Sequence, residues 1–167
     1  MLEAVRYGLL AALAIALVLA ALTDWRRRHI DNWLTAAVAL GGLAFWWASG
    51  LQPWPGIVLQ AGLFALTFAV CAGLFALRAM GGGDVKLLAA LALWIEPAPF
   101  ARLLVLMALI GGALTLGMVA WHIQRRRPGL PEIPYGVAIA AAGLWVLASD
   151  WLWPGAAESG ENQILTI

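Results

Sequence analysis

The sequence predicts an all-α protein that crosses a membrane about six times. Of its 167 residues, 63% are hydrophobic and only 11% are charged, whereas an ordinary soluble domain has about 45–50% and about 25%. The apolar residues also fall in runs that approach the roughly 20 residues a helix needs to cross a bilayer. Because no long polar stretch separates these runs, we expect one membrane domain over residues 1–155 and a short tail over residues 156–167.

Five apolar runs have about the length of a membrane-spanning helix, and a sixth is short. The long runs cover residues 5–23, 33–51, 57–77, 103–123 and 135–153. The short run, Leu87–Ile95, is the fourth in chain order. Because it is too short to cross a bilayer of full thickness, we expect it to cross where the membrane is thinned or to be re-entrant and shielded by neighbouring helices.

The basic residues predict the orientation in the membrane. With six crossings, eight of the ten basic residues lie in the segments 24–32, 78–86 and 124–134. Basic residues concentrate on the cytoplasmic side of membrane proteins. These segments are therefore expected in the cytoplasm and both termini outside it. The short fourth run has to count as a crossing, because otherwise Arg125–Arg127 would be external.

Aromatic and small residues give two further expectations about helix ends and helix contacts. Six tryptophans lie near the predicted outer ends, where amphipathic rings prefer the interface: Trp46, Trp47, Trp54, Trp94, Trp151 and Trp153. The pairs Gly41–Gly42 and Gly111–Gly112 are expected to let helices approach closely, a common packing feature of membrane chains.

Few residues could hold a metal ion or a cofactor. Cys71 is the only cysteine, so the chain has no internal disulfide and no Cys-x-x-Cys pair. His29 and His122 lie far apart in sequence and lack the spacing of metal ligands. We therefore expect no metal and no cofactor. The net charge of +1 gives no indication of a nucleic-acid partner, and none is expected.

Two acidic residues, Asp24 and Asp84, fall on the same predicted membrane face. Ionisable groups at membrane depth are functional candidates, because a charge at the bilayer centre costs about 2.5–3.5 kcal/mol and less towards the interface. Structural alternatives remain open for each residue alone. Asp24 could pair with Arg27 or Arg28, and Asp84 could be the N-cap of a helix that begins at Val85.

Three glycines, Gly81–Gly83, directly precede Asp84. Glycine has no Cβ and permits unusual backbone angles, so a peptide could approach the acid closely and lie extended against this segment. A flexible hinge is the alternative interpretation of the same glycines. The first interpretation describes the geometry that a protease needs.

Two segments of the chain resemble motifs of the type IV prepilin peptidases, which share a Gly-x-Gly-Asp signature with presenilin-like intramembrane aspartyl proteases. Asp24–Asn32 is similar to the family's first-aspartate motif, and Gly81–Lys86 is similar to its second. Ile133–Ala138 resembles the family's Pro-aromatic-Gly stretch before the last helix. The order, spacing and membrane placement agree, and the resemblance covers nearly the whole chain.

The sequence departs from the family pattern in two ways. Asp31 stands where the first motif often has proline, so the loop loses a restraint and gains a third acid. Larger members also carry a cysteine-rich cytoplasmic domain and methylate the new N-terminus, and this chain has neither the room nor the cysteines for that domain. It therefore resembles the short, peptidase-only branch of tight-adherence (Flp) pilus systems, for which no N-methyltransferase activity is expected.

The resemblance implies a membrane aspartyl endopeptidase that removes the leader peptide of a prepilin or pseudopilin at the cytoplasmic face of the bacterial inner membrane. Its partners would be that leader peptide and the lipid bilayer, and the oligomeric state stays open. Amide hydrolysis needs one carboxylate to take a proton from water and one carboxylic acid to give a proton. Two nearby acids supply both, because the charge of one raises the pKa of the other.

Asp24 and Asp84 are accordingly the predicted catalytic residues, and their acid and base roles are not assigned individually. The residues expected to shape the site or contact the substrate are Gly81, Gly83, Lys86, Arg28 and Asn32. For the basic residues, a role as topological anchors is the alternative. Asp150 is excluded because it lies near the outer end of the last helix.

Two other functions use the same residues differently. A proton-coupled transporter or channel would carry protons on membrane acids, but both acids lie at one face and none lies near the midplane of the helices. A non-catalytic scaffold for pilus assembly would bind the substrate without cleaving it.

Overall fold

The computed structural model of the protein describes residues 1–125 and 133–152. Within these ranges the chain forms helices and no strand, in the order α1 (Leu2–Arg27), α2 (Asn32–Ala48), η1 (Pro53–Ile57), α3 (Val58–Ala76), α4 (Gly82–Leu91), α5 (Pro97–Gln124), α6 (Tyr135–Leu147) and η2 (Ala148–Leu152). The all-α prediction is confirmed. The predicted tail, residues 156–167, lies outside the described residues.

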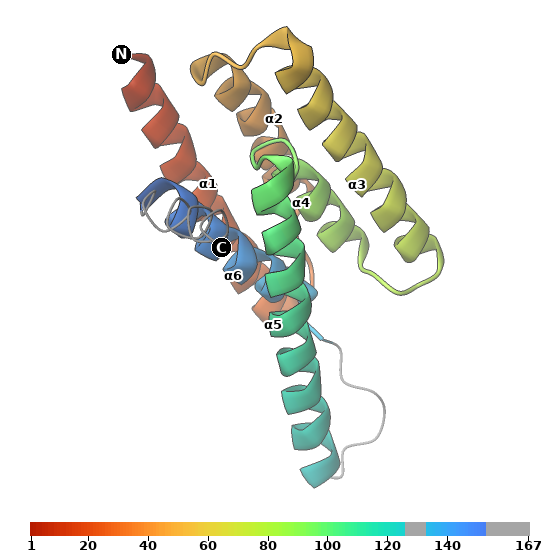
Figure 1. Ribbon diagram of the computed structural model, residues 1–167. Coiled ribbons are helices and arrows are strands. Elements are labelled where there is room, and N and C mark those ends of the chain that lie inside the picture. Colours follow the sequence, from red (N-terminus) through yellow and green to blue (C-terminus); the bar gives the residue numbers. More distant parts are fainter. Residues whose placement is uncertain (126–132, 153–167) are drawn as a thin grey trace, which may run out of the picture.

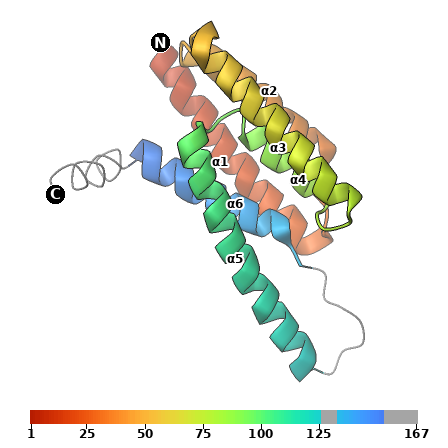
Figure 2. The ribbon, with the colours of Figure 1, turned by 45° about the vertical axis from the view of Figure 1, so that its right-hand side comes forward.

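Three helical segments are long and apolar enough to cross a membrane: α1, the continuous stretch Pro53–Ala76, and α5. Tyr135–Asp150 is a shorter apolar helix. The α1–α2 loop and the α3–α4 loop lie at the end of the bundle opposite the N-terminus, and α5 runs in the same direction and projects beyond them (Figures 1 and 2). The protein is therefore a multi-pass helical membrane protein, and the basic segments 24–32 and 78–86 lie at the same end of it. Most of the third basic segment, 124–134, lies outside the described residues.

The short helix α4 lies inside the bundle. It packs against α2, α3 and α6, and every residue from Leu87 to Ile95 is buried. The run is thus shielded by neighbouring helices. A helix that is apolar on all sides buries every face in this way.

Side chains from α2 and α3 satisfy the backbone where α4 ends. The buried side chain of Gln60 donates from Nε2 to the carbonyl oxygens of Ala92 (3.0 Å) and Ile95 (2.7 Å). The Trp46 indole Nε1 donates to the carbonyl of Leu93 at 2.6 Å. Carbonyls beyond a helix end have no partner within the helix, and an apolar interior offers them no water. These two side chains therefore allow α4 to stop within the bundle.

The prediction that Trp94 anchors the outer interface is wrong. Its side chain is only 6% exposed, and its Nε1 donates to the carbonyl of Val38 in α2 at 2.8 Å. The ring lies where a Cβ on Gly41 would come within 2.7 Å of Trp94 Cζ2. A Cβ on Gly42 would similarly lie 2.7 Å from Leu93 Cβ. The expected close approach at this glycine pair is confirmed. The two glycines leave room that the Trp94 side chain occupies.

The second glycine pair behaves differently at its two positions. A Cβ on Gly111 would meet the Tyr135 ring at 3.2 Å, whereas nothing lies within 4 Å of the corresponding point on Gly112. Close approach therefore holds for Gly111 alone. Among the other predicted anchors, Trp47 and Trp54 are exposed, as an interfacial position requires. The side chains of Trp151 and Trp153 lie outside the described residues.

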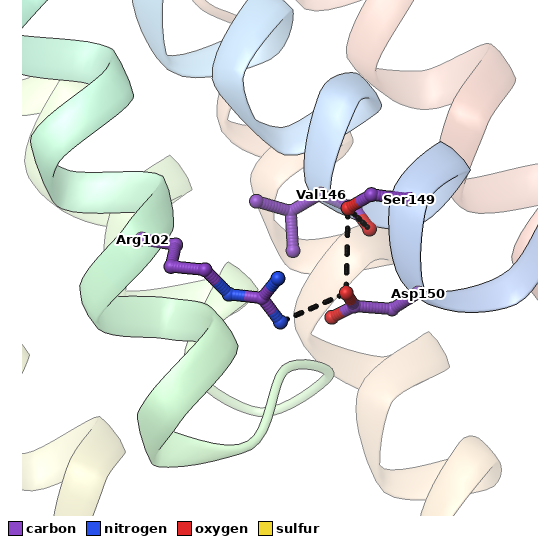
Figure 3. Close-up of polar contacts among 4 residues, drawn as sticks. All are labelled: Arg102, Val146, Ser149 and Asp150. Atoms are coloured by element: carbon purple, nitrogen blue, oxygen red, sulfur yellow. Dashed lines mark hydrogen bonds and ion pairs between the residues drawn. The ribbon is translucent and has the colours of Figure 1, made fainter. Parts of the chain in front are cut away.

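An ion pair joins α5 to the end of the last helix. Arg102 Nη2 lies 2.9 Å from Asp150 Oδ1, and Ser149 Oγ donates to the same carboxylate oxygen at 3.3 Å and to the carbonyl of Val146 at 3.0 Å (Figure 3). Both charged residues were predicted on the same outer side, and they meet. The contact gives Asp150 a structural partner, which agrees with its exclusion as a catalytic candidate.

Replacing Gln60 with leucine should destabilise the protein, because it leaves the carbonyls of Ala92 and Ile95 buried without a donor. Each such group costs about 1–3 kcal/mol. We expect a loss of that size in the free energy of unfolding, measured by titration with a denaturing detergent in mixed micelles. The control is Gln52→Leu at an exposed position, where the change should stay within about 0.5 kcal/mol. Equal losses for both variants would contradict the role given to Gln60.

Candidate active site

The side chain of Asp24 is buried in the last turns of α1, 6% exposed. It lies beside the start of α6, where the backbone amides of Gly136 and Val137 adjoin its carboxyl group. Its Oδ2 atom is buried and accepts no hydrogen bond within the described residues. The amino end of a helix carries partial positive charge. The start of α6 therefore favours a negative charge at this otherwise apolar position.

Asp24 does not form the predicted alternative, an ion pair with Arg27 or Arg28. Ion pairs in the described part of the chain include Arg6–Glu3 and Arg102–Asp150, and neither involves Asp24. Arg28 contacts Asp24 through the backbone, where its N–H donates to the Asp24 carbonyl at 2.9 Å. The Arg28 guanidinium lies 5.9 Å from the centroid of the Trp25 ring. Ion pairing therefore does not account for the buried carboxylate.

Asp84 lies in the first turn of α4 and is not its N-cap. The helix begins at Gly82, and Gly81 takes the N-cap position, so the alternative that placed a helix start at Val85 is wrong. The carboxyl group turns back towards Gly81: a Cβ there would lie 2.8 Å from Asp84 Oδ2. Glycine at position 81 thus leaves room for the carboxyl group, which any larger residue would displace.

Gly83 has a different role from Gly81. A Cβ at Gly83 would lie 3.1 Å from the Cβ of Ile30, and Ile30 is buried in the loop between α1 and α2. The absence of a side chain lets α4 approach this loop closely. Gly83 therefore sets the distance between the segment after Asp24 and the helix that carries Asp84, and it does not line the pocket described next.

One open pocket of about 710 Å³ brings both acids together. It lies where the end of α1, the end of α3, the α3–α4 loop and the start of α6 converge on α4. Its lining residues are Asp24, Arg28, Phe75, Ala76, Arg78, Ala79, Met80, Gly81, Asp84, Ile133 and Tyr135. Of the predicted site residues, the pocket thus contains Asp24, Asp84, Gly81 and Arg28.

Two arginines flank the acids in an uncommon backbone conformation. Arg28 has φ 53° and Arg78 has φ 60°, in the left-handed region that costs an L-residue roughly 1–2 kcal/mol. Both follow the end of a helix and both line the pocket. They place positive charge beside two carboxyl groups that would otherwise repel each other.

The pKa of Asp84 is raised from its ordinary value of 3.8 to about 6, mainly by burial and further by the negative charge of Asp24. The backbone of Gly81 acts in the opposite direction and is included in that value. Asp84 belongs to the segment 78–86, predicted to lie outside the membrane spans. A carboxyl group that keeps its proton up to about pH 6 can donate it beside a second carboxyl group.

Lys86 and Asn32 lie apart from this pocket. Lys86 Nζ donates to Asn32 Oδ1 at 2.8 Å, and both residues line a separate groove between α2, α3 and α4. Lys86 follows Asp84 by two residues, which turns it to a different face of the helix. The motif alone did not predict that Asp84 and Lys86 lie on different faces. The expected start of α4, Val85, is three residues after the observed start, Gly82.

Several residues in the pocket or beside Asp24 were not among the predicted site residues. Arg78 was predicted only as a cytoplasmic basic residue. Tyr135 and Gly136 belong to the stretch Ile133–Ala138, which was noted only for its likeness to a family motif. A Cβ on Gly136 would lie 2.8 Å from Asp24 Oδ2 and 2.8 Å from Ile30 Cδ1. The Pro-aromatic-Gly pattern was therefore the available signal for this side of the site.

Residues 11–116 match the type IV leader peptidase family. The chain belongs to this family. It is 33% identical over 149 residues to a prepilin leader peptidase/N-methyltransferase of Aeromonas salmonicida (strain A449), a match that covers 84% of this chain and 49% of that protein. A protein of the same description from Aeromonas hydrophila is 32% identical over the same shares. The chain thus spans about half the length of these relatives. No solved structure matches the chain significantly.

Because Asp24 and Asp84 line one pocket, their titrations should be coupled. Replacing Asp24 with asparagine removes the charge that helps to raise the pKa of Asp84. The pKa of Asp84 should then fall below about 6 and stay above 3.8, because burial is the larger cause. Infrared difference spectroscopy of the carboxyl band across a pH titration measures this. A pKa of Asp84 unchanged by Asp24→Asn would show that the two acids do not interact.

Proposed function

We propose that this protein is a membrane aspartyl endopeptidase that cleaves the leader peptide of prepilins or pseudopilins. One observation carries the proposal: Asp24 and Asp84, far apart in sequence, line the same pocket. Membership of the type IV leader peptidase family supports it, and the description of the Aeromonas relatives supplies the substrate class.

The proposed chemistry uses the two carboxyl groups as one acid–base pair. The ionised carboxyl takes a proton from a water molecule, and the water oxygen attacks the carbonyl carbon of the scissile peptide bond. The protonated carboxyl gives its proton to the carbonyl oxygen, which forms a tetrahedral intermediate. Collapse of the intermediate breaks the C–N bond as a proton passes to the departing amine. The raised pKa of Asp84 supports a pair that shares one proton at mildly acidic pH.

The surroundings of the pair support a peptide as the substrate. Gly81 leaves backbone beside Asp84 without a side chain, and the α3–α4 loop forms one side of the pocket. An extended peptide could lie against this loop. We propose that Gly81 and Arg28 contact or position the substrate, while Gly83 keeps α4 close to the α1–α2 loop. Lys86 and Asn32 face another groove, so we place them outside the cleavage site.

The location of the pocket supports cleavage at a membrane edge. The residues that line the pocket include Arg28 after α1 and Arg78 before α4. The two loops that follow α1 and α3 lie at the end of the bundle opposite the N-terminus (Figure 1), and basic loops favour the cytoplasmic side. We propose that this end faces the cytoplasm at the bacterial inner membrane, with both termini on the other side.

We also propose cleavage without N-methylation, because the groups gathered in the pocket are those of acid–base hydrolysis. A relay of protons across the membrane finds no support: Asp24 is the only charged side chain among the buried residues that the structure describes.

Neutralising either acid should abolish leader cleavage. Asp24→Asn and Asp84→Asn each remove one half of the acid–base pair, and we expect cleavage of a co-reconstituted prepilin to fall by about 10²–10⁴-fold. Gel mobility of the prepilin measures the loss. The matched control, Asp150→Asn, makes the same change at the opposite end of α6 and should leave cleavage near the wild-type rate.

Three results would contradict different parts of the proposal. Full processing by both asparagine variants would exclude an aspartyl mechanism. Binding of the prepilin without cleavage by the wild-type protein, equal in both variants, would favour the scaffold interpretation. Transfer of a labelled methyl group to the cleaved product would contradict the absence of methylation and leave the peptidase proposal intact.

A methyl group added at Gly136 should impair cleavage without a charge change. In Gly136→Ala the new Cβ would crowd Asp24 Oδ2, so the carboxyl group has to move. A displacement of about 1 Å can cost up to about 100-fold in rate, and we expect the loss in the rate constant for cleavage. Gly112→Ala is the control, because its Cβ would meet nothing within 4 Å. Equal rates for both variants would show that Gly136 does not position Asp24.

A further inference from the structure

A second groove lies between α2 and α3, away from the acid pair. One wall is formed by Phe64 and Phe68 of α3, whose rings are stacked with centroids 6.2 Å apart and planes 14° apart. The other wall carries the small residues Ala36 and Ala39 of α2. The groove has a volume of about 280 Å³. It is thus an open, largely apolar groove with two aromatic rings along one side.

The floor and the mouth of this groove differ in chemistry. Ala89 and Ala90 of α4 form the floor, and both are buried. At the mouth, Lys86 and Asn32 form their hydrogen bond at the first turns of α4 and α2. Because these turns follow the α3–α4 and α1–α2 loops, the polar mouth lies at the basic end of the bundle. The groove therefore presents a cationic end followed by an apolar length.

The mouth offers hydrogen-bond donors to an incoming group. Lys86 uses one ammonium proton on Asn32 Oδ1, which leaves two further protons on Nζ and both protons on the amide nitrogen of Asn32. Ionised phosphate oxygens accept hydrogen bonds and donate none. The mouth therefore suits an anion whose remaining part is apolar.

We propose that this groove binds an anionic phospholipid, with its phosphate at Lys86 and Asn32 and one acyl chain between the Phe64–Phe68 wall and the alanines. The groove holds only about 280 Å³, which favours a lipid acyl chain. A peptide helix, about 10–12 Å across with its side chains, is too bulky for this volume. Basic pockets between membrane helices on the cytoplasmic side are known sites for anionic headgroups. The site is independent of the proposed cleavage site, because the residues lining the two do not overlap.

The test compares lipid retention by variants of the full chain. The protein is reconstituted in nanodiscs with equal phosphatidylglycerol and phosphatidylcholine, extracted in mild detergent and analysed by native mass spectrometry. We expect bound phosphatidylglycerol in preference to phosphatidylcholine. Lys86→Gln should weaken this preference about fivefold, the effect of one basic residue near the membrane surface. Lys86→Arg should keep it.

The matched control is Arg125→Gln, which removes a basic residue at the same end of the bundle, where Arg125 lies 4.6 Å from the Trp121 ring centroid. Its lipid preference should match that of the wild type. Equal losses for Lys86→Gln and Arg125→Gln would mean unspecific attraction to a basic surface and would overturn the proposal.

A steric variant tests the apolar part separately. Ala36→Phe adds bulk to an exposed position in the wall and should expel the lipid while the thermal unfolding midpoint stays at the wild-type value. Retention of phosphatidylglycerol by this correctly folded variant would overturn the proposal. A photoreactive residue at position 36 identifies the occupant: cross-links to acyl chains support the proposal, whereas cross-links to a co-reconstituted prepilin or to a second copy of the chain would overturn it.

Discussion

The structure depends on satisfying the backbone at the end of α4. An apolar segment too short to cross a membrane leaves carbonyl groups within the bundle, where no water can bind them. Gln60 and Trp46 donate to those carbonyls, and Trp94 fills the space at Gly41 and Gly42. These contacts hold α4 between α2, α3 and α6. The depth at which its first turn presents Asp84 follows from that position.

The acid pair is assembled by three chain segments that are separate in sequence. Asp24 ends α1, Asp84 begins α4, and the first turn of α6 lies beside Asp24. Glycines in two of these segments make the contacts possible: Gly81 leaves room for one carboxyl group and Gly136 for the other, while Gly83 lets Ile30 approach. Close packing of small residues therefore sets the geometry of the carboxyl groups, and the positive start of α6 offsets part of the cost of burying a charge.

The two faces of the first turn of α4 have different chemistry. Asp84 faces the acid pocket with Arg28 and Arg78, and Lys86 faces the groove with Asn32. Both faces lie at the basic end of the bundle. A bound anionic lipid at Lys86 would hold the start of α4 at the level of the headgroups, which is where a peptide bond at the membrane edge would meet Asp84. The two proposed sites would then share one structural element while binding different ligands.

The sequence by itself determined the all-α membrane class, the shortness of the fourth run and the two acids. The length and hydropathy of a segment indicate directly whether it lies in an apolar environment. The two aspartate motifs were sufficient to single out Asp24 and Asp84. Hydropathy cannot distinguish lipid from the protein interior, so the inward position of Trp94 and the complete burial of Leu87–Ile95 needed the tertiary structure. The tertiary structure also decided that Lys86 lies apart from Asp84. It likewise decided that Arg78, Tyr135 and Gly136 belong to the site. These features depend on where helices stop and which faces meet, and packing between distant segments sets both.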